Sequence, residues 1–362
     1  SARTSEALAE SARRLVGHLQ ASPDENLADV AFTLSQGRKA FAQRVTVVAD
    51  APADAIAKLG QLQIAKSNIR VGDAGVVFMF PGQGAQYPGM GRGLHAREPV
   101  FRAALDECVE LLAGELGFDL RERLFSDAAD ALLDTGVTQP ATFAIEYALA
   151  RLWMSLGLVP RLLIGHSVGE FVAAVLAGVM SLEDGLLLVA RRGRLMQAQP
   201  AGAMLSVRLD SESLKARLPA SLSLAVENGP SACVVAGEIA DIETMRIALE
   251  ADGVACRALR TSHAFHSAMM DPVLAPFRAE VGRVALSAPK LPIMSTLSAS
   301  LLADDEATSA DYWTRHLRGT VRFHSALSCL LESHPDVALI EVGPRATLTT
   351  LARQQAQKPR LV

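Results

Sequence analysis

The sequence is poor in the residues that mark several protein classes. It has four cysteines in 362 residues, at positions 108, 233, 256 and 329, and none of them belongs to a Cys-x-x-Cys pair. This spacing indicates neither a disulfide framework nor a zinc site, so we expect free thiols in a reducing cytosol. Aromatic residues make up only 5% of the chain, and abundant Ala and Leu favour aliphatic helices.

Strong charge of one sign and long hydrophobic runs are also missing. The formal net charge of −4 carries no signature of nucleic-acid binding. The longest apolar stretch, around 171–180, is far shorter than the roughly 20 residues that span a membrane. The first residues, Ser1-Ala2-Arg3-Thr4, do not form the charged and apolar regions of a signal peptide. We therefore expect a soluble, cytoplasmic protein whose partners include neither nucleic acid nor membrane.

What is present is the composition of a globular chain, with 50% hydrophobic and 20% charged residues. Residues 1–72 differ in pattern from the rest. Helical spacing predicts helices at 5–19, 27–34 and 53–62, and the β-branched run at 44–49 predicts a strand. This small α+β unit has no glycine-rich loop and no combination of Ser, His and Asp. We expect it to be a docking or linker module.

Strands that alternate with helices follow from about residue 73. The apolar runs at 75–80 and 161–164 each end in a turn signal and predict buried strands, with a helical pattern at 142–156 between them. A late strand is expected at 339–344. This alternation predicts an α/β fold with a parallel sheet.

The pattern changes again from about residue 202. Short strand-like runs are separated by short helical ones, which predicts a small α+β subdomain inserted in the larger one. Strands are expected at 203–207, 223–226 and 233–237, and helices at 211–218 and 239–251.

The pentapeptide Gly165-His166-Ser167-Val168-Gly169 fits the G-x-S-x-G pattern of a nucleophile elbow. An apolar strand precedes it and a helix-compatible run at 170–179 follows, which is the context that an elbow needs. The N-terminus of that helix favours the negative charge that develops during attack. The alternative is a tight turn whose serine only caps the helix. We identify Ser167 as the candidate nucleophile.

The run Phe80-Pro81-Gly82-Gln83-Gly84-Ala85-Gln86 is the second motif. Its glycines match neither the dinucleotide pattern nor the P-loop pattern. We interpret it as a loop at the end of a strand, beside the serine turn, with free backbone N–H groups. One of these and the N–H of Val168 would make a two-donor oxyanion hole. The alternative is a plain turn.

An arginine pair ends an apolar, helix-like run at 186–190. Such arginines are often solvated at a helix end, but a buried one could clamp a substrate carboxylate with two hydrogen bonds. The residues alone do not decide between Arg191 and Arg192.

Two histidines, His263 and His266, stand three residues apart. They could be metal ligands on one helical turn, but no third ligand has a suitable spacing, so we predict no metal site. A general base for Ser167 is the favoured role. His166 is a weaker candidate for the base, and we expect it to support the elbow.

Together these segments resemble the family of malonyl-CoA:acyl-carrier-protein transacylases, and closely the acyltransferase domains of modular polyketide synthases. The order and spacing match over about residues 75–350, and residues 1–72 resemble the linker between ketosynthase and acyltransferase domains. The matching segments are Phe80-Pro81-Gly82-Gln83-Gly84-Ala85-Gln86, Thr138-Gln139-Pro140-Ala141, Gly165-His166-Ser167-Val168-Gly169-Glu170, Arg192-Gly193, His263-Ala264-Phe265-His266-Ser267 and Glu341-Val342-Gly343-Pro344.

The resemblance implies an α/β-hydrolase-like core with a parallel sheet and a small inserted ferredoxin-like α+β subdomain. The linker would occupy residues 1–72 and the acyltransferase domain 73–350. Within that domain the core would comprise 73–204 and 269–350, and the insertion 205–268. Residues 351–362 would follow as a second linker segment, so we expect the chain to be a piece of a longer polypeptide.

The resemblance also implies roles for individual residues. Ser167 would be the nucleophile and His266, rather than His263, the base. The backbone N–H groups of Gln83 and Val168 would form the oxyanion hole, and the backbone carbonyl of His316 would orient the base. The substrate would be bound by Arg192, Phe265, Gln139 and His166, with Arg192 on its carboxylate and Phe265 excluding an α-methyl group.

The implied reaction is a ping-pong transfer of malonyl from malonyl-CoA to the phosphopantetheine thiol of an acyl carrier protein, with no bound cofactor. The carrier protein, malonyl-CoA and a flanking ketosynthase domain would be the partners. A serine thioesterase or other hydrolase is the alternative, although no convincing Asp lies between Ser167 and His266. A catalytically silent docking module is the third possibility.

Overall fold

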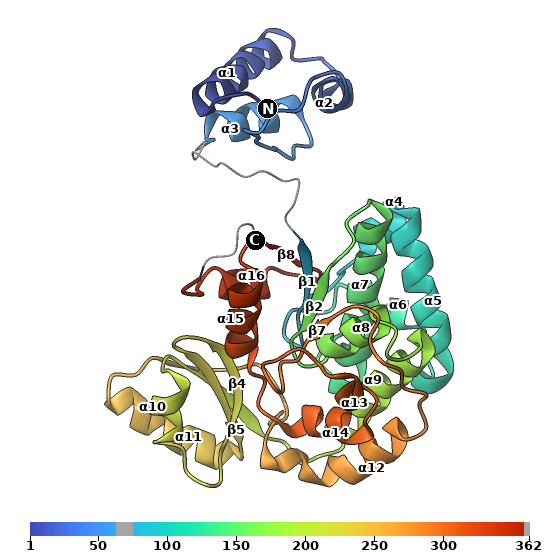
Figure 1. Cartoon of the computed structure of the whole chain (residues 1–362), viewed down its shortest axis with the longest axis vertical. Coiled ribbons are helices and arrows are strands. Elements are labelled where there is room, and N and C mark those ends of the chain that lie inside the picture. Colours follow the sequence, from blue (N-terminus) through green and yellow to red (C-terminus); the bar gives the residue numbers. More distant parts are fainter. Residues whose placement is uncertain (63–74, 358–362) are drawn as a thin grey trace. The chain divides into compact units, whose positions relative to one another are not determined.

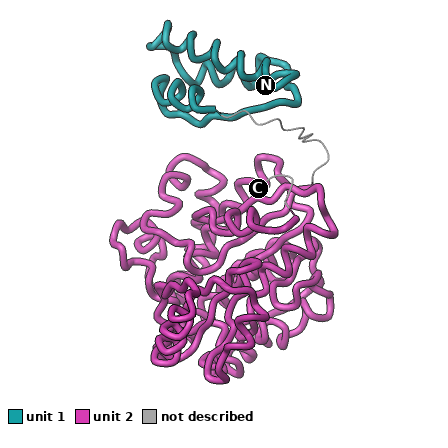
Figure 2. The backbone as a smooth tube through the Cα atoms, turned by 90° about the vertical axis from the view of Figure 1, so that its left-hand side faces the viewer, with its two compact units in different colours: residues 1–74 teal, residues 75–362 magenta. Residues whose placement is uncertain are grey.

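The computed structural model describes residues 1–62 and 75–357. The chain divides into two compact units, residues 1–74 and residues 75–362, drawn in teal and magenta in Figure 2. No helix in the described ranges is long and apolar enough to cross a membrane.

The first unit is built from three helices, α1 (Ser5–Ala21), α2 (Leu27–Gln36) and α3 (Pro52–Gly60). Thr4 caps α1 by accepting a hydrogen bond from the backbone N–H of Ala7. The strand expected at 44–49 is wrong. A strand needs a partner, and within residues 1–62 the only bridge joins Ala2 to Gln43.

The second unit contains the predicted parallel sheet, in the order β7-β2-β1-β8 (Figure 1). Its strands are β1 (Val76–Phe80), β2 (Leu162–Gly165), β7 (Ile293–Met294) and β8 (Ala338–Glu341). All three pairings are parallel, and Phe80 at the end of β1 lies opposite Gly165 at the end of β2. The ends of the two central strands therefore bring the two glycine-containing loops together.

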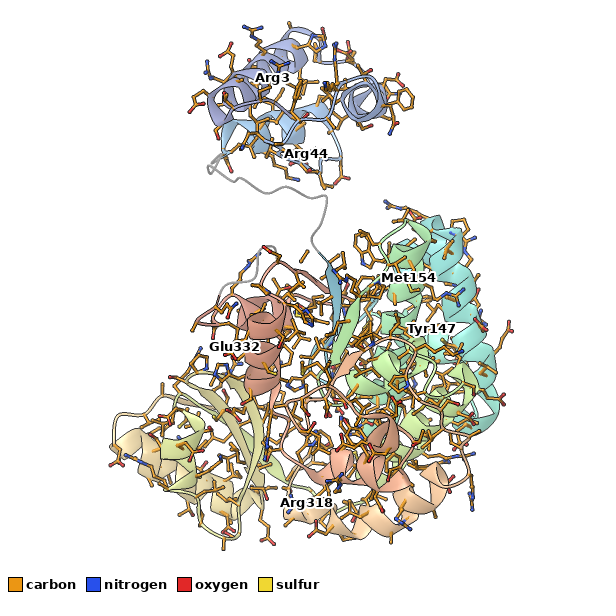
Figure 3. All side chains as sticks on the ribbon, viewed as in Figure 1. Arg3, Arg44, Tyr147, Met154, Arg318 and Glu332 are labelled. Carbon is orange, nitrogen blue, oxygen red and sulfur yellow. The ribbon has the colours of Figure 1, made fainter. Side chains whose placement is uncertain are left out.

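Helices surround this sheet, and side chains fill the space between the helices and the strands (Figure 3). Most residues of the long helix α7 are buried, on all sides of the helix, because it packs against both α5 and α9. The helices before the insertion are α4 (Arg92–Arg97), α5 (Pro99–Leu116), α6 (Leu120–Leu124), α7 (Thr135–Ser155), α8 (Gly169–Leu176) and α9 (Leu182–Gln197). Those after it are η1 (Ala268–Met270), α12 (Asp271–Val281), α13 (Asp304–Ala307), α14 (Ala310–Arg318), α15 (Phe323–Ser333) and α16 (Thr347–Ala352).

The insertion has the βαββαβ order and the strand arrangement β4-β5-β3-β6 of a ferredoxin-like fold, as expected. Its elements are β3 (Ala203–Val207), α10 (Ser211–Lys215), β4 (Ser223–Gly229), β5 (Ala232–Gly237), α11 (Ile239–Ala251) and β6 (Cys256–Ala258). The sheet starts at Ala203, before the boundary that we predicted at 205. The short strands β6 and β7 were not predicted.

Successive side chains along a strand point to opposite faces of the sheet, and both faces of the inserted sheet are buried. Leu205 and Val235 pack into a separate small core with the two helices of the insertion. Their neighbours Met204 and Val234 face the other way and join the main core. The insertion is therefore packed firmly on the large core.

Candidate active site

Ser167 stands at a sharp turn between β2 and α8, with a left-handed φ of +52°. Glycine is required at positions 165 and 169 because neither has room for a Cβ atom. A Cβ atom at Gly165 would lie 2.2 Å from the backbone nitrogen of Glu170, and one at Gly169 would lie 2.3 Å from the carbonyl oxygen of Phe80. The turn therefore has the close approach of strand, loop and helix that defines a nucleophile elbow.

His266 reaches Ser167 from the segment that follows the insertion. Its Nε2 lies 2.7 Å from the Ser167 hydroxyl oxygen, and its Nδ1 lies 2.9 Å from the backbone carbonyl oxygen of Gly319. A carbonyl can only accept, so Nδ1 carries the proton and Nε2 is free to accept the serine proton. The two side chains thus have the geometry of a Ser-His dyad, in which a backbone carbonyl orients the histidine.

The backbone carbonyl that we expected to orient His266 was that of His316, and this prediction is wrong. His316 lies inside α14, where carbonyls point along the helix axis. Gly319 follows the last residue of that helix, and its ψ of 157° turns its carbonyl away from the axis. The imidazole of His316 points elsewhere, and its Nε2 lies 3.5 Å from Oε2 of the buried Glu170.

Burial is the main cause that lowers the pKa of His266 well below 6.5, the ordinary histidine value. The positive charge of Arg192 lowers this pKa further, and the hydrogen bond to Gly319 offsets part of the effect. The imidazole is therefore neutral at physiological pH, which is the protonation state that a general base requires.

Arg192 is fully buried and lies beside the dyad. One terminal nitrogen donates to Gln139 Oε1 at 2.7 Å, the other lies 3.3 Å from the Ser167 hydroxyl, and Nε has no partner. Burial lowers the pKa of its guanidinium to about 10. Among the described residues no carboxylate forms an ion pair with it. A buried cation of this kind is a site for an anion.

Arg191, the competing residue, lies on the outer side of α9. It forms ion pairs with Glu115 and Glu280, at 3.0 and 2.7 Å. The structure thus brings Arg192 to Ser167 and leaves Arg191 in a surface network.

The loop after β1 lies against the elbow, because a Cβ atom at Gly82 would come within 2.6 Å of the His166 carbonyl oxygen. Gln83 and Val168 donate no backbone hydrogen bond to another described residue. The side chain of Gln139 connects this loop to the arginine, because its Nε2 lies 3.4 Å from Gln83 Oε1. The expectation that these two N–H groups form an oxyanion hole stays a prediction.

His166 and Phe265, which we expected to bind the substrate, have their described contacts with other residues. The His166 Nε2 lies 2.9 Å from Oδ1 of Asn228, a residue of β4 that sequence reasoning missed because Asn-Gly-Pro is also an ordinary turn signal. Phe265 stacks on His263, with ring centroids 6.2 Å apart. His263 in turn contacts the backbone carbonyl of Gln199 at 3.1 Å, away from Ser167.

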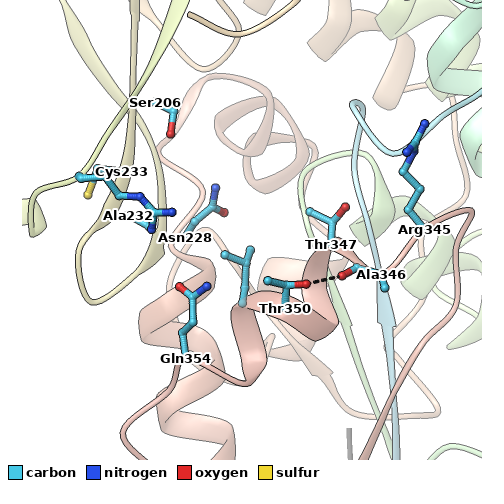
Figure 4. A pocket seen from close by; sticks show the side chains of 11 residues that line it. Ser206, Asn228, Ala232, Cys233, Arg345, Ala346, Thr347, Thr350 and Gln354 are labelled. Carbon is cyan, nitrogen blue, oxygen red and sulfur yellow. Dashed lines mark hydrogen bonds between the residues drawn. The ribbon is translucent and has the colours of Figure 1, made fainter. Parts of the chain in front are cut away.

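A cleft of about 650 Å³ lies between the insertion and α16 (Figure 4). It adjoins the elbow, since Asn228 both lines the cleft and contacts His166. The other lining side chains that could bind a polar ligand are Ser206, Arg208, Arg345, Thr347, Thr350 and Gln354.

Comparison with protein families matches residues 77–360 to the family described as "Acyl transferase domain" and residues 1–59 to "CurL-like, PKS C-terminal". Polyketide synthase GfsA of Streptomyces halstedii is 40% identical over 369 residues, which cover 98% of this chain and 5% of that protein. Spectinabilin polyketide synthase system protein NorB of Streptomyces orinoci is 38% identical over 366 residues, covering 98% of this chain and 17% of that protein. The chain thus spans less than a fifth of the length of these two curated relatives.

Solved structures with this fold include the acyl transferase domain of SpnD in complex with 2-(pent-4-yn-1-yl)malonyl. It has a TM-score of 0.91 and 36% identity, and the match covers 99% of this chain and 88% of that one. The malonyl CoA-acyl carrier protein transacylase from Burkholderia pseudomallei has a TM-score of 0.71 and 29% identity, over 78% of this chain and 98% of that one.

The elbow geometry predicts that Gly165→Ala is strongly destabilising. The added methyl group would meet backbone atoms that cannot easily move aside, and such overpacking costs about 1–3 kcal/mol. Urea unfolding followed by tryptophan fluorescence measures the loss. Gly114→Ala is the control, since nothing lies within 4 Å of its Cβ position in α5, and it should gain up to about 1 kcal/mol. Equal stability of the two variants would contradict the packing argument.

The electrostatics predict the pH dependence of Ser167 reactivity. Because the pKa of His266 is lowered, the rate of modification by a neutral fluorophosphonate should stay constant as the pH falls through 6.5 and should decline only below it. Arg192→Ala removes one cause of the lowering, so the decline should move to higher pH, whereas Arg191→Ala should leave it in place. A decline in the wild-type protein centred above pH 6.5 would disprove the proposed state of His266.

Proposed function

The chain belongs to the acyl transferase domain family of polyketide synthases, and from this premise we propose that it moves a malonyl group from malonyl-CoA through Ser167 to the phosphopantetheine thiol of an acyl carrier protein. The observation that carries the proposal is the fully buried Arg192 beside the Ser167 hydroxyl, which forms no ion pair with a carboxylate of the described residues. A buried cation that faces the nucleophile selects an acyl group with a free carboxylate.

In the first step His266 Nε2 takes the proton of the Ser167 hydroxyl as Oγ attacks the thioester carbon. The oxyanion of the tetrahedral intermediate accepts hydrogen bonds from the backbone N–H groups of Gln83 and Val168. The carbon–sulfur bond then breaks, the proton on His266 passes to the CoA sulfur, and a malonyl ester of Ser167 remains.

In the second step the same groups act in reverse. The pantetheine thiol gives its proton to His266 and attacks the ester, and the proton returns to Ser167 as the carbon–oxygen bond breaks. Arg192, held by Gln139 at 2.7 Å, keeps the malonyl carboxylate in one orientation through both steps. These two steps need no bound cofactor.

Phe265 supports malonyl over its α-methyl analogue. Its ring is buried, adjoins His266 in the chain and is held by stacking on His263. We infer that it fills the space that an α-methyl group would need. One methyl group is worth only about 1–3 kcal/mol in a pocket, so this preference would be incomplete.

The side chains that line the cleft beside Asn228 are suited to bind a long polar ligand. Arg208 and Arg345 line it together with several hydroxyl and amide groups. CoA and the phosphopantetheine arm both carry phosphate and amides, so we propose that this cleft admits them to Ser167. An acyl carrier protein and a flanking ketosynthase domain are the protein partners that this role requires.

A serine hydrolase that releases the acyl group to water is the competing function. Hydrolases of this elbow type orient the histidine with a carboxylate, whereas His266 faces the carbonyl of Gly319. The buried Arg192 also has no role in a general esterase. Both observations favour transfer to a thiol.

The decisive experiment follows the fate of a radiolabelled malonyl group. We expect malonyl-CoA to label Ser167, intact-protein mass spectrometry to show the adduct, and a carrier protein to remove the label as malonyl-carrier. Ser167→Ala should abolish the adduct. Fast release of free malonate without transfer would favour the hydrolase, and an adduct that survives Ser167→Ala would place the nucleophile elsewhere.

Arg192→Ala should change substrate preference rather than abolish the chemistry. We expect malonyl loading to fall on the order of a hundredfold in kcat/KM, which corresponds to about 2.7 kcal/mol, while acetyl-CoA becomes a comparable substrate. Competition between malonyl-, methylmalonyl- and acetyl-CoA measures the ratio. Arg191→Ala, which removes the adjacent surface arginine, should keep the wild-type ratio. An unchanged malonyl preference in Arg192→Ala would refute the clamp.

A further inference from the structure

We propose that His316 is a positioning residue, whose buried imidazole lies against the buried carboxylate of Glu170 and thereby fixes both the serine elbow and the carbonyl that orients His266. The inference rests on the proposed Ser-His chemistry. It assigns a function to a buried basic side chain that the mechanism itself does not use.

Glu170 is the first partner in this arrangement. It follows the elbow directly in α8, is completely buried, and accepts hydrogen bonds from the hydroxyl of Tyr312 and the backbone N–H of Thr296, the latter at 3.0 Å. Thr296 Oγ1 lies 2.8 Å from the carboxylate and 3.0 Å from the carbonyl oxygen of Gly165. The carboxylate is thus connected to both ends of the elbow.

His316 supplies the basic group that this carboxylate faces. Its side chain is buried, and its Nε2 lies 3.5 Å from Glu170 Oε2, a distance of an ion pair rather than of a good hydrogen bond. The ring packs edge-on against Phe171 of α8 and is stacked near Tyr312 of its own helix. These contacts hold α14 against the helix that carries the elbow.

The same helix ends at the orienting carbonyl. Gly319 lies three residues after His316, and its carbonyl oxygen is 2.9 Å from His266 Nδ1. A Cβ atom at Gly319 would lie 2.4 Å from a methyl carbon of Leu297, so this residue packs closely against Leu297. A shift of α14 relative to α8 would therefore change the geometry of the dyad directly.

Electrostatics agree with this geometry. Burial alone would raise the pKa of Glu170, but the His316 charge and the hydrogen bonds to the carboxylate lower it overall. The other titratable groups near His316 are Tyr312, whose ring stacks near its imidazole, and His166 and His266, whose pKa values a charge on His316 lowers. A charge on His316 also contributes to the low pKa of His266.

Two substitutions separate the titratable ring of His316 from its polar contact. His316→Gln keeps a polar N–H group opposite Glu170 and removes the titratable ring, whereas His316→Leu removes both. We expect the plateau rate of fluorophosphonate modification of Ser167 to fall about tenfold to a hundredfold in His316→Leu, the order of loss that small misplacements cause, and to stay close to wild type in His316→Gln. In both variants the acid decline should move to higher pH.

Leu317→Ala is the matched control, since Leu317 is an equally buried neighbour in α14 without a polar group. It should lower stability and leave the plateau and the pH profile unchanged. The proposal is overturned when His316→Leu reacts like the wild type, or when Leu317→Ala is as impaired as His316→Leu. Where His316→Leu does not fold, an unchanged pH profile in His316→Gln overturns it. A wild-type protein that is not modified at Ser167 would instead refute the proposed function.

Discussion

The site depends on one close approach, at the point where β2, the loop after β1 and the N-terminus of α8 meet. Only glycine fits at 165 and 169, and the chain between them must turn so sharply that Ser167 takes a left-handed φ of +52°. A non-glycine residue in that conformation costs on the order of 1–3 kcal/mol. The cost is tolerated because the surrounding packing fixes the turn, above all the buried Glu170 immediately after it.

The second half of the dyad depends on how the insertion is attached to the core. Residues 319–322 lie between the two and bond to both: Thr320 Oγ1 donates to Leu224 and the backbone N–H of Arg322 donates to Thr296. Val321 forms a bridge with Val226 of β4. The carbonyl of Gly319 at the start of this segment therefore has a defined position relative to Ser167, although the two belong to distant parts of the sequence.

Local sequence was sufficient to predict the large elements and the elbow, because buried strands and the glycine pattern leave strong signals. The strand at 44–49 failed because its β-branched run is a local signal, whereas no partner strand lies beside it in the described residues. The short strands β6 and β7 exist because longer neighbours pair with them, which no local pattern reveals. Gly319 and Asn228 were missed because their contacts, over 53 and 62 positions, depend on the tertiary fold.

The sequence could not decide between Arg191 and Arg192, whereas their different burial in the structure does. Adjacent residues on a helix point about 100° apart, so one can face the core while the other faces solvent. Arg192 then lowers the pKa of His266 while no anion is bound. Under the proposed function, a malonyl carboxylate on Arg192 would offset that charge and make His266 a stronger base at the moment when the correct substrate is in place. An acyl group without a carboxylate would leave the charge uncompensated, so the same arginine would serve both binding and discrimination in the chemical step.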